Sequence, residues 1–163
     1  MTAGRKRPVT SGRADRDGRK KAGGMTTRLI DESLFDGADP PRLVGARCTG
    51  CRTVVFPRQN SCPKCSDGAM AAHVLPDSGE IWSWTVQSFR PKEPYRPPTG
   101  DHQPYALGYV DLGEILVEAR LDIPRRLIRI GLPVRLTTVE AYRDEDGTRI
   151  LTFAFGSAAE DER

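Results

Sequence analysis

All four cysteines of the chain fall into two pairs with the same spacing. The pairs are Cys48-Thr49-Gly50-Cys51 and, after ten intervening residues, Cys62-Pro63-Lys64-Cys65. Each CxxC turn brings two sulfurs together, and two such turns supply the four tetrahedral thiolate ligands that a structural Zn²⁺ prefers. We expect Gly50 to give the first turn its backbone freedom. The spacing therefore predicts a closed metal site, with zinc as the cofactor, on Cys48, Cys51, Cys62 and Cys65.

Three other uses of these sulfurs stay open from the sequence: two disulfides, a thioredoxin-like redox pair, or an iron centre. Paired CxxC turns without further cysteines favour a metal, and zinc over iron. A site closed by four thiolates has no open coordination position, so the predicted role is structural rather than catalytic. Metal-spaced cysteines also favour a reducing compartment, and we expect a cytoplasmic protein.

The net charge of +3 is unevenly distributed along the 163 residues. Residues 1–24 hold eight Lys or Arg and two acids, a net charge of +6, whereas residues 25–163 carry a net charge of −3. The segment 1–24 has no apolar anchor, so it is interpreted as a disordered basic tail, and Met25 is a plausible alternative start. No apolar run approaches the length of a membrane span.

Residues 25–76 are interpreted as a short helix followed by a zinc ribbon. Leu29, Ile30, Leu34 and Phe35 recur at helical intervals, which predicts a helix over residues 28–36 that ends before Gly37. Short extended segments then flank the cysteine turns, as in a zinc ribbon. A turn cluster at residues 76–79 marks the predicted domain boundary.

Residues 77–157 are predicted to form a five-stranded OB-fold barrel, and residues 158–163 a second disordered tail. Alternating apolar residues indicate strands over 81–89, 105–112, 115–121, 133–142 and 148–155, with a short helical crossover over 125–130. Five strands with an insertion between the third and fourth favour the OB fold over an SH3-like barrel. The fold class is therefore mainly β.

A zinc ribbon joined to an OB barrel raises the alternative of single-stranded nucleic-acid binding. Such binders need a basic groove with exposed aromatic side chains. The body here is acidic, and Trp82 and Trp84, two residues apart, are interpreted as barrel core on one face with Val86. Nucleic-acid binding through the barrel is therefore the less favoured hypothesis.

No catalytic constellation is recognisable in the sequence. His73 and His102 lack the nucleophile and carboxylate neighbours of covalent catalysis. Residues 90–104 contain five prolines and form a long connection, of the kind that is often functional. Its aromatic and basic side chains are the candidate contacts to a partner or to acyl-CoA: Arg90, Lys92, Tyr95 and Arg96.

The order of these motifs resembles a known family. Four stretches carry the resemblance: the ribbon with Phe56-Pro57-Arg58 between its cysteine pairs, the run Gly79-Glu80-Ile81-Trp82-Ser83-Trp84, the run Pro104-Tyr105-Ala106-Leu107-Gly108-Tyr109, and Ile130-Gly131-Leu132-Pro133-Val134. The chain is similar over residues 34–156 to acyl-CoA-associated OB-fold proteins with a rubredoxin-like zinc ribbon. Longer members have a helical hairpin where this chain has one predicted helix.

The resemblance implies an accessory subunit rather than a freestanding enzyme. Family members pair with thiolase-fold proteins, including thiolases, ketoacyl-CoA synthase-like enzymes and the retro-aldolases of steroid side-chain degradation, or with hydratase-like chains, in lipid metabolism. By this resemblance, we expect a hetero-oligomer in which the partner carries the catalytic residues and this chain supports the acyl-CoA site. The four cysteines carry over as metal ligands, and no catalytic residue carries over.

Overall fold

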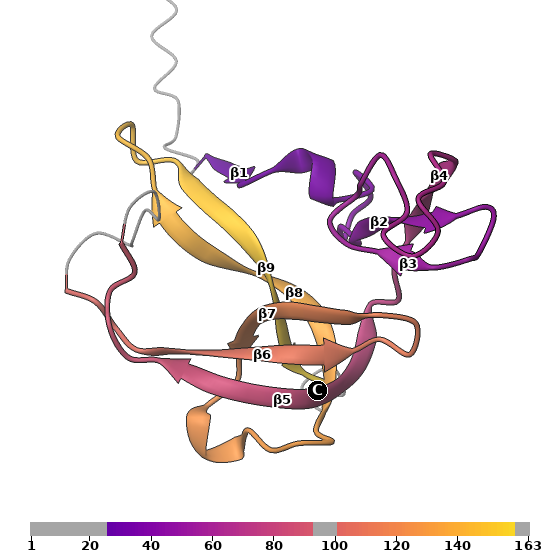
Figure 1. Ribbon diagram of the computed structural model, residues 1–163. Helices are drawn as coiled ribbons and strands as arrows, with labels where there is room; N and C mark the ends of the chain where they lie inside the picture. Colours follow the sequence, from indigo (N-terminus) through magenta and orange to yellow (C-terminus); the bar gives the residue numbers. More distant parts are fainter. Residues whose placement is uncertain (1–25, 93–100, 159–163) are drawn as a thin grey trace, which may run out of the picture.

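The computed structural model describes residues 26–92 and 101–158, which form two sheets joined in one chain (Figure 1). The ribbon sheet contains β2 (Val44–Cys48), β3 (Val54–Val55) and β4 (Met70–Val74). The barrel sheet contains β1 (Thr27–Leu29), β5 (Ser78–Gln87), β6 (Tyr105–Asp111), β7 (Leu116–Asp122), β8 (Pro133–Arg143) and β9 (Arg149–Ser157). The fold is mainly β, as the sequence predicts.

Five of the six strands close a barrel. The hydrogen-bonded order runs β9-β7-β6-β5-β8, and a further pairing between β8 and β9 joins the two ends. The β7–β9 pair is parallel and the remaining barrel pairs are antiparallel. Each of the five strands pairs with two neighbours in the barrel, and β1 adds to β9 in parallel as a sixth strand. The five-stranded barrel is therefore confirmed.

Period-two alternation places the core where the sequence predicts it. On β7 the side chains of Val117, Ala119 and Leu121 are buried while their neighbours Leu116 and Glu118 are exposed. The inner side chains of the other strands complete one cluster, in which Ile81, Val110, Val134 and Phe155 are almost fully buried. The outer face of these strands is consequently free to present other residues to solvent or to a partner.

The predicted helix over residues 28–36 is wrong. Residues 27–29 form β1 instead, and a single 3-10 turn, η1 (Glu32–Leu34), follows. The edge of β9 offers backbone partners along residues 149–151, and a nine-residue segment is too short to hold a helix on its own. The side chain of Asp31 then accepts a hydrogen bond from the Ser33 amide, which begins the 3-10 turn. The predicted crossover over 125–130 likewise contains only one 3-10 turn, η2 (Arg125–Leu127).

The interpretation of Trp82 as barrel core is also wrong. The β5–β6 register shifts between Ile81 and Ser83, so that Trp82 is an extra residue opposite β6. Such a β-bulge changes the direction of the side chains around it. The side chain of Trp82 is 55% exposed, whereas Trp84 packs against the core. The two tryptophans therefore do not share a face.

The remaining predictions about chain organisation are only partly covered by the described residues. The tails predicted at 1–24 and 158–163 lie outside these residues, apart from Ala158. The division into residues 25–76 and 77–157 stays an interpretation, and β1 shows that a segment before the ribbon pairs with the barrel. Within the described ranges, no helix has the length and apolar character needed to cross a bilayer.

Candidate metal centre and the ribbon–barrel joint

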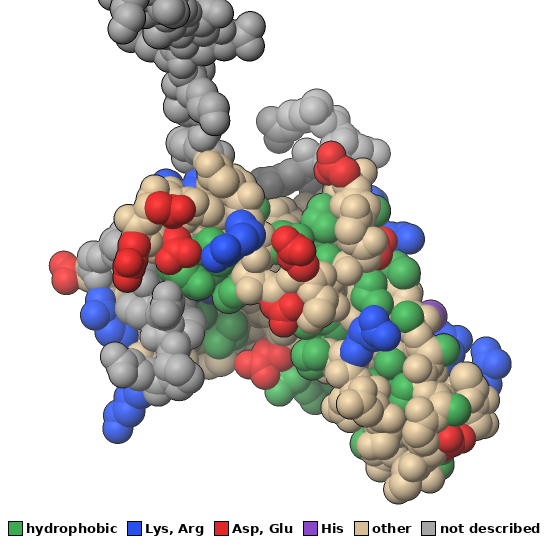
Figure 2. All heavy atoms as spheres, turned by 90° about the horizontal axis from the view of Figure 1, so that it is seen from above, with side chains coloured by type: hydrophobic (Ala, Val, Ile, Leu, Met, Phe, Trp, Pro, Cys, Tyr) green, Lys and Arg blue, Asp and Glu red, His purple; other side chains and the backbone are tan. Residues whose placement is uncertain are grey.

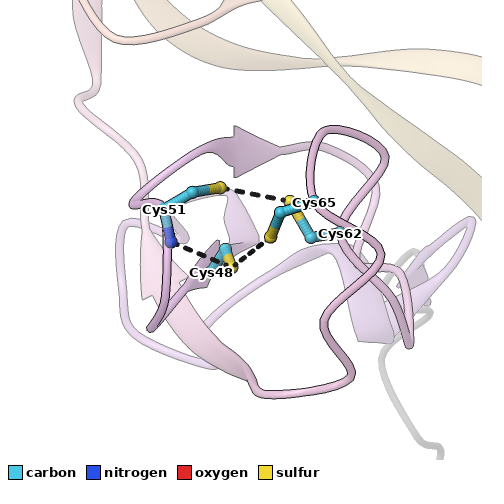
Figure 3. A group of neighbouring side chains, drawn as sticks. All are labelled: Cys48, Cys51, Cys62 and Cys65. Carbon is cyan, nitrogen blue, oxygen red and sulfur yellow. Dashed lines mark hydrogen bonds between the residues drawn. The ribbon is translucent and has the colours of Figure 1, made fainter.

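The four cysteine sulfurs converge on one point of the ribbon (Figure 3). Cys48 ends β2, Cys51 follows in the same turn, and Cys62 and Cys65 come from the second turn, which faces the first. All four sulfur atoms lie within 4.8 Å of one another. The predicted quartet is thus brought together, with Cys48 and Cys62 buried and Cys65 exposed.

The sulfur spacings fit a metal and not a disulfide. The Sγ atoms of Cys48 and Cys65 are 3.6 Å apart, and those of Cys51 and Cys62 are 3.5 Å apart. A tetrahedron with Zn–S bonds of about 2.3 Å has sulfur–sulfur edges of about 3.8 Å. A disulfide needs a separation of about 2.05 Å. These two spacings are therefore close to the edge length of such a tetrahedron and too long for a disulfide.

The two cysteine turns have the same backbone design. The amide of Arg52 donates to the Cys48 carbonyl at 3.0 Å, and the amide of Ser66 donates to the Cys62 carbonyl at 2.8 Å. Arg52 and Ser66, each directly after the second cysteine of its pair, have positive φ angles of 64° and 60°. The left-handed positions of the two turns are therefore Arg52 and Ser66, whereas Gly50 does not have a positive φ angle. This repeated turn aims both cysteines of a pair in one direction.

Local hydrogen bonds make these thiols unequal. The Thr53 hydroxyl, 3.2 Å from the Cys51 sulfur, is the main cause that lowers the pKa of Cys51 to about 6. The backbone amide of Cys65 lowers the pKa of Cys62. The Asp67 amide acts in the same direction on Cys65, but the sulfurs of Cys51 and Cys48 outweigh it and raise the pKa of Cys65 to about 12. The neighbouring sulfurs thus oppose ionisation of the Cys65 thiol, and a cation bound among them would relieve that repulsion.

A carboxylate of the barrel holds two side chains of the ribbon. Glu114, in the turn between β6 and β7, forms an ion pair with Arg47 of β2 and lies 2.5 Å from Nε2 of His73 on β4. Arg47 is also 2.8 Å from the same His73 nitrogen. When Nε2 carries a proton it donates to Glu114, and otherwise it accepts from Arg47. In either state the three side chains connect the two sheets.

Apolar contacts complete this joint between ribbon and barrel. The ring of Phe56, from the ribbon, meets Phe153 of β9 edge to face, with centroids 5.5 Å apart. Leu43 and Leu75, at the two chain crossings between the sheets, are almost fully buried in the barrel's core cluster. The space-filling view shows the ribbon as a lobe at the right that projects from the barrel (Figure 2). The joint therefore fixes a projecting lobe at its base.

The predicted partner contacts in the proline-rich connection are only half described. Arg90 and Lys92 are exposed at its start, while Tyr95 and Arg96 lie outside the described residues. His102, at its end, hydrogen-bonds to the Gln87 carbonyl oxygen at 3.2 Å and contacts the Tyr105 ring. His102 thus helps to anchor the connection to β5 and β6.

Sequence reasoning missed Glu114 and the outward position of Trp82. Glu114 lies in the short connection between the predicted strands 105–112 and 115–121. Nothing in the local pattern indicated its contacts with His73, 41 positions earlier, and Arg47, 67 positions earlier. The bulge at Trp82 depends on the register between β5 and β6, which the sequence of β5 alone does not contain.

Two family models match adjacent parts of this chain. Residues 35–71 match the rubredoxin-like zinc ribbon domain of ChsH2, and residues 72–139 match its C-terminal OB-fold domain. The chain belongs to the ChsH2/DUF35 family. The family's ribbon domain coincides with the four-cysteine cluster, which is consistent with a structural metal.

Relatives of this chain are named as a thiolase subunit, a scaffold protein and a chain of an aldolase complex. The chain is 28% identical over 125 residues to benzoylsuccinyl-CoA thiolase subunit BbsA of Thauera aromatica, covering 76% of this chain and 81% of BbsA. It is 30% identical over 116 residues to a DUF35 domain-containing scaffold protein of Methanocaldococcus jannaschii, covering 69% and 78% of the two chains. A chain of the solved Ltp2-ChsH2(DUF35) aldolase aligns with a TM-score of 0.56 and 27% identity, over 79% of this chain and 95% of that one. The family is thus associated with thiolase and aldolase complexes.

Proposed function

We propose that this ChsH2/DUF35 protein is a non-catalytic accessory subunit that binds a thiolase-fold acyl-CoA enzyme and supports its acyl-CoA site. The observation that carries the proposal is the similarity, over most of the chain, to a named thiolase subunit and to a chain of an aldolase complex. The partner would be a thiolase, a ketoacyl-CoA synthase-like enzyme or a steroid side-chain retro-aldolase, and the assembly a cytoplasmic hetero-oligomer in lipid metabolism.

In this proposal Cys48, Cys51, Cys62 and Cys65 hold one structural zinc ion. The sulfur spacings, the two matching turns and the family's ribbon domain support this assignment. The metal would keep the lobe folded, because three short strands bury too little apolar surface to do so alone. Metal analysis of the purified protein distinguishes zinc from iron, since a four-sulfur iron centre is coloured and zinc is not.

The use of the ionisable side chains supports a role without catalysis. His73 and Glu114 are engaged between ribbon and barrel, and His102 is engaged with a backbone carbonyl. A relative in the same family is a scaffold protein. Arg90, Lys92, Tyr95 and Arg96 remain the proposed contacts of the proline-rich connection with the partner or with acyl-CoA.

Co-expression with the thiolase-fold proteins of the source genome tests the proposal. A tagged copy of this chain should retain one of them through affinity purification and size-exclusion chromatography, and the two should elute as a single species. Separate elution from every thiolase-fold candidate would contradict the proposed function. Glu145→Lys, in the exposed turn after β8, serves as a variant that leaves the ribbon and its joint unchanged.

A further inference from the structure

The outer face of β5, β6 and β7 carries an aromatic patch that the ribbon, the barrel core and the joint do not use. The patch consists of Trp82, Tyr109 and Leu116, whose side chains are 55%, 42% and 40% exposed. The rings of Trp82 and Tyr109 meet edge to face with centroids 6.4 Å apart. Exposed apolar groups that contact one another differ from isolated surface residues, because they form a continuous surface that water solvates poorly.

Strand register shows that the patch is continuous. Tyr109 lies opposite Ser83, next to the bulged Trp82, and opposite Glu118 on β7. Leu116 lies opposite Asp111, two residues after Tyr109 on the same face of β6. The three strands lie side by side below the ribbon in Figure 1. The bulge is what brings the Trp82 side chain to this face.

Carboxylates surround the patch. Glu80, Asp111 and Glu118 are exposed on the same three strands. Neither β5 nor β6 contains a lysine or arginine, and the one on β7, Arg120, lies over the Tyr105 ring toward the other end of the sheet. The Glu118 carboxylate, opposite Tyr109 on β7, raises the pKa of the Tyr109 hydroxyl by hydrogen bonding and by its charge. The patch is thus apolar and aromatic in the middle and negative at its rim.

We propose that this patch is the docking surface for the thiolase-fold partner, and that the partner offers it an apolar contact region edged by lysine or arginine. The inference rests on the proposed function and specifies its interface. Tryptophan and tyrosine contribute most often to the energetic centre of protein interfaces, where surrounding groups exclude water. A rim of one charge selects a partner of the opposite charge and accelerates association. The same carboxylates repel the phosphates of a nucleic-acid backbone, which disfavours nucleic-acid binding at this aromatic surface.

Binding measurements on single variants test the proposal. The probe is the thiolase-fold chain recovered with the wild-type protein by co-expression, immobilised for biolayer interferometry. We expect Trp82→Ala to weaken Kd by about 30-fold and Tyr109→Ala by about tenfold, with the near-ultraviolet signal of Trp84 retained. Glu80→Lys should weaken Kd at low salt, and the difference from wild type should shrink as salt is added. Leu127→Ala is the control, because Leu127 is 48% exposed but lies in η2, outside the patch.

The outcomes separate the inference from the function on which it rests. If the wild type binds and Trp82→Ala binds within threefold of it, the docking surface is elsewhere and the accessory function stands. If Leu127→Ala weakens binding as much as Trp82→Ala, the patch has no special role and the inference is overturned. If the wild type binds no thiolase-fold chain, the proposed function fails and the inference fails with it.

Discussion

Removing the Glu114 carboxylate should loosen the ribbon from the barrel. In the wild type this carboxylate contacts Arg47 and His73, and all three side chains are only about a quarter to a third exposed, at 27%, 31% and 26%. Hydrogen bonds to charged groups contribute about 1.5–3 kcal/mol each when buried, and partial solvent screening reduces that value. Glu114→Ala should therefore lower the free energy of unfolding by about 2 kcal/mol.

Thermal unfolding measures this effect. A loss of about 2 kcal/mol corresponds to a Tm lower by about 4–8 °C for a chain of this size. Hydrogen exchange should accelerate in β2 and β4 of the ribbon before it does so in the barrel strands. Glu145→Ala is the control, because Glu145 is an exposed acid in the turn between β8 and β9. The double variant with Arg47→Ala should cost less than the sum of the two single variants.

The reasoning would be refuted by a Tm of Glu114→Ala within 1 °C of the wild type and unchanged exchange in the ribbon. That result would mean that Phe56, Phe153 and the buried leucines at the chain crossings hold the two sheets together without the ion pairs.

Three further predictions concern the metal, the barrel and the patch. Cys51→Ser should lose the bound metal, measured by elemental analysis, and its ribbon should unfold while the circular dichroism signal of the barrel strands persists. Ser61→Ala is the control. Full metal retention in Cys51→Ser would contradict the ligand assignment. Gly79→Ala should lower the free energy of unfolding by about 1–3 kcal/mol in urea, because a Cβ there would lie 2.2 Å from the Asp111 carbonyl oxygen. Gly113→Ala is the comparison variant, because a Cβ there meets no atom within 4 Å and is strained only by the φ of 84°. Glu118→Gln should lower the pKa of Tyr109 toward 10.0, so that the phenol absorbance change at 295 nm occurs at lower pH. A raised pKa in the folded state stabilises the protein below pH 10, and that contribution disappears as pH rises through the folded value. The wild type should therefore lose more stability than Glu118→Gln in that alkaline range.

The features that sequence predicts well are those with local causes. The spacing of Cys48, Cys51, Cys62 and Cys65 is enough to bring four sulfurs together, because each turn is formed by four consecutive residues. Alternation on β7 identifies Val117, Ala119 and Leu121 as core without knowledge of the neighbouring strands. Both patterns are read within a few residues, although the contact that joins the two cysteine turns spans 17 residues, from Cys48 to Cys65.

The features that sequence misses depend on distant partners. Residues 27–29 form a strand because the edge of β9, more than 100 residues later, supplies their hydrogen bonds. Trp82 faces outward because of a register shift against β6, and Glu114 gains its role only when the ribbon folds back on the β6–β7 turn. The apolar residues around Leu34 and Phe35 do mark a buried segment, but that segment is not helical. Phe35 is buried from an extended backbone that pairs with Leu43.

Turnover of a β-ketoacyl-CoA by separate and combined chains tests the central claim most directly. The measurement compares thiolytic cleavage by this chain alone, by its thiolase-fold partner alone, and by the co-purified complex at equal concentration. The account predicts no turnover by this chain alone and faster or longer-lasting turnover by the complex than by the partner alone. Turnover by this chain in the absence of any partner would contradict an accessory, non-catalytic role.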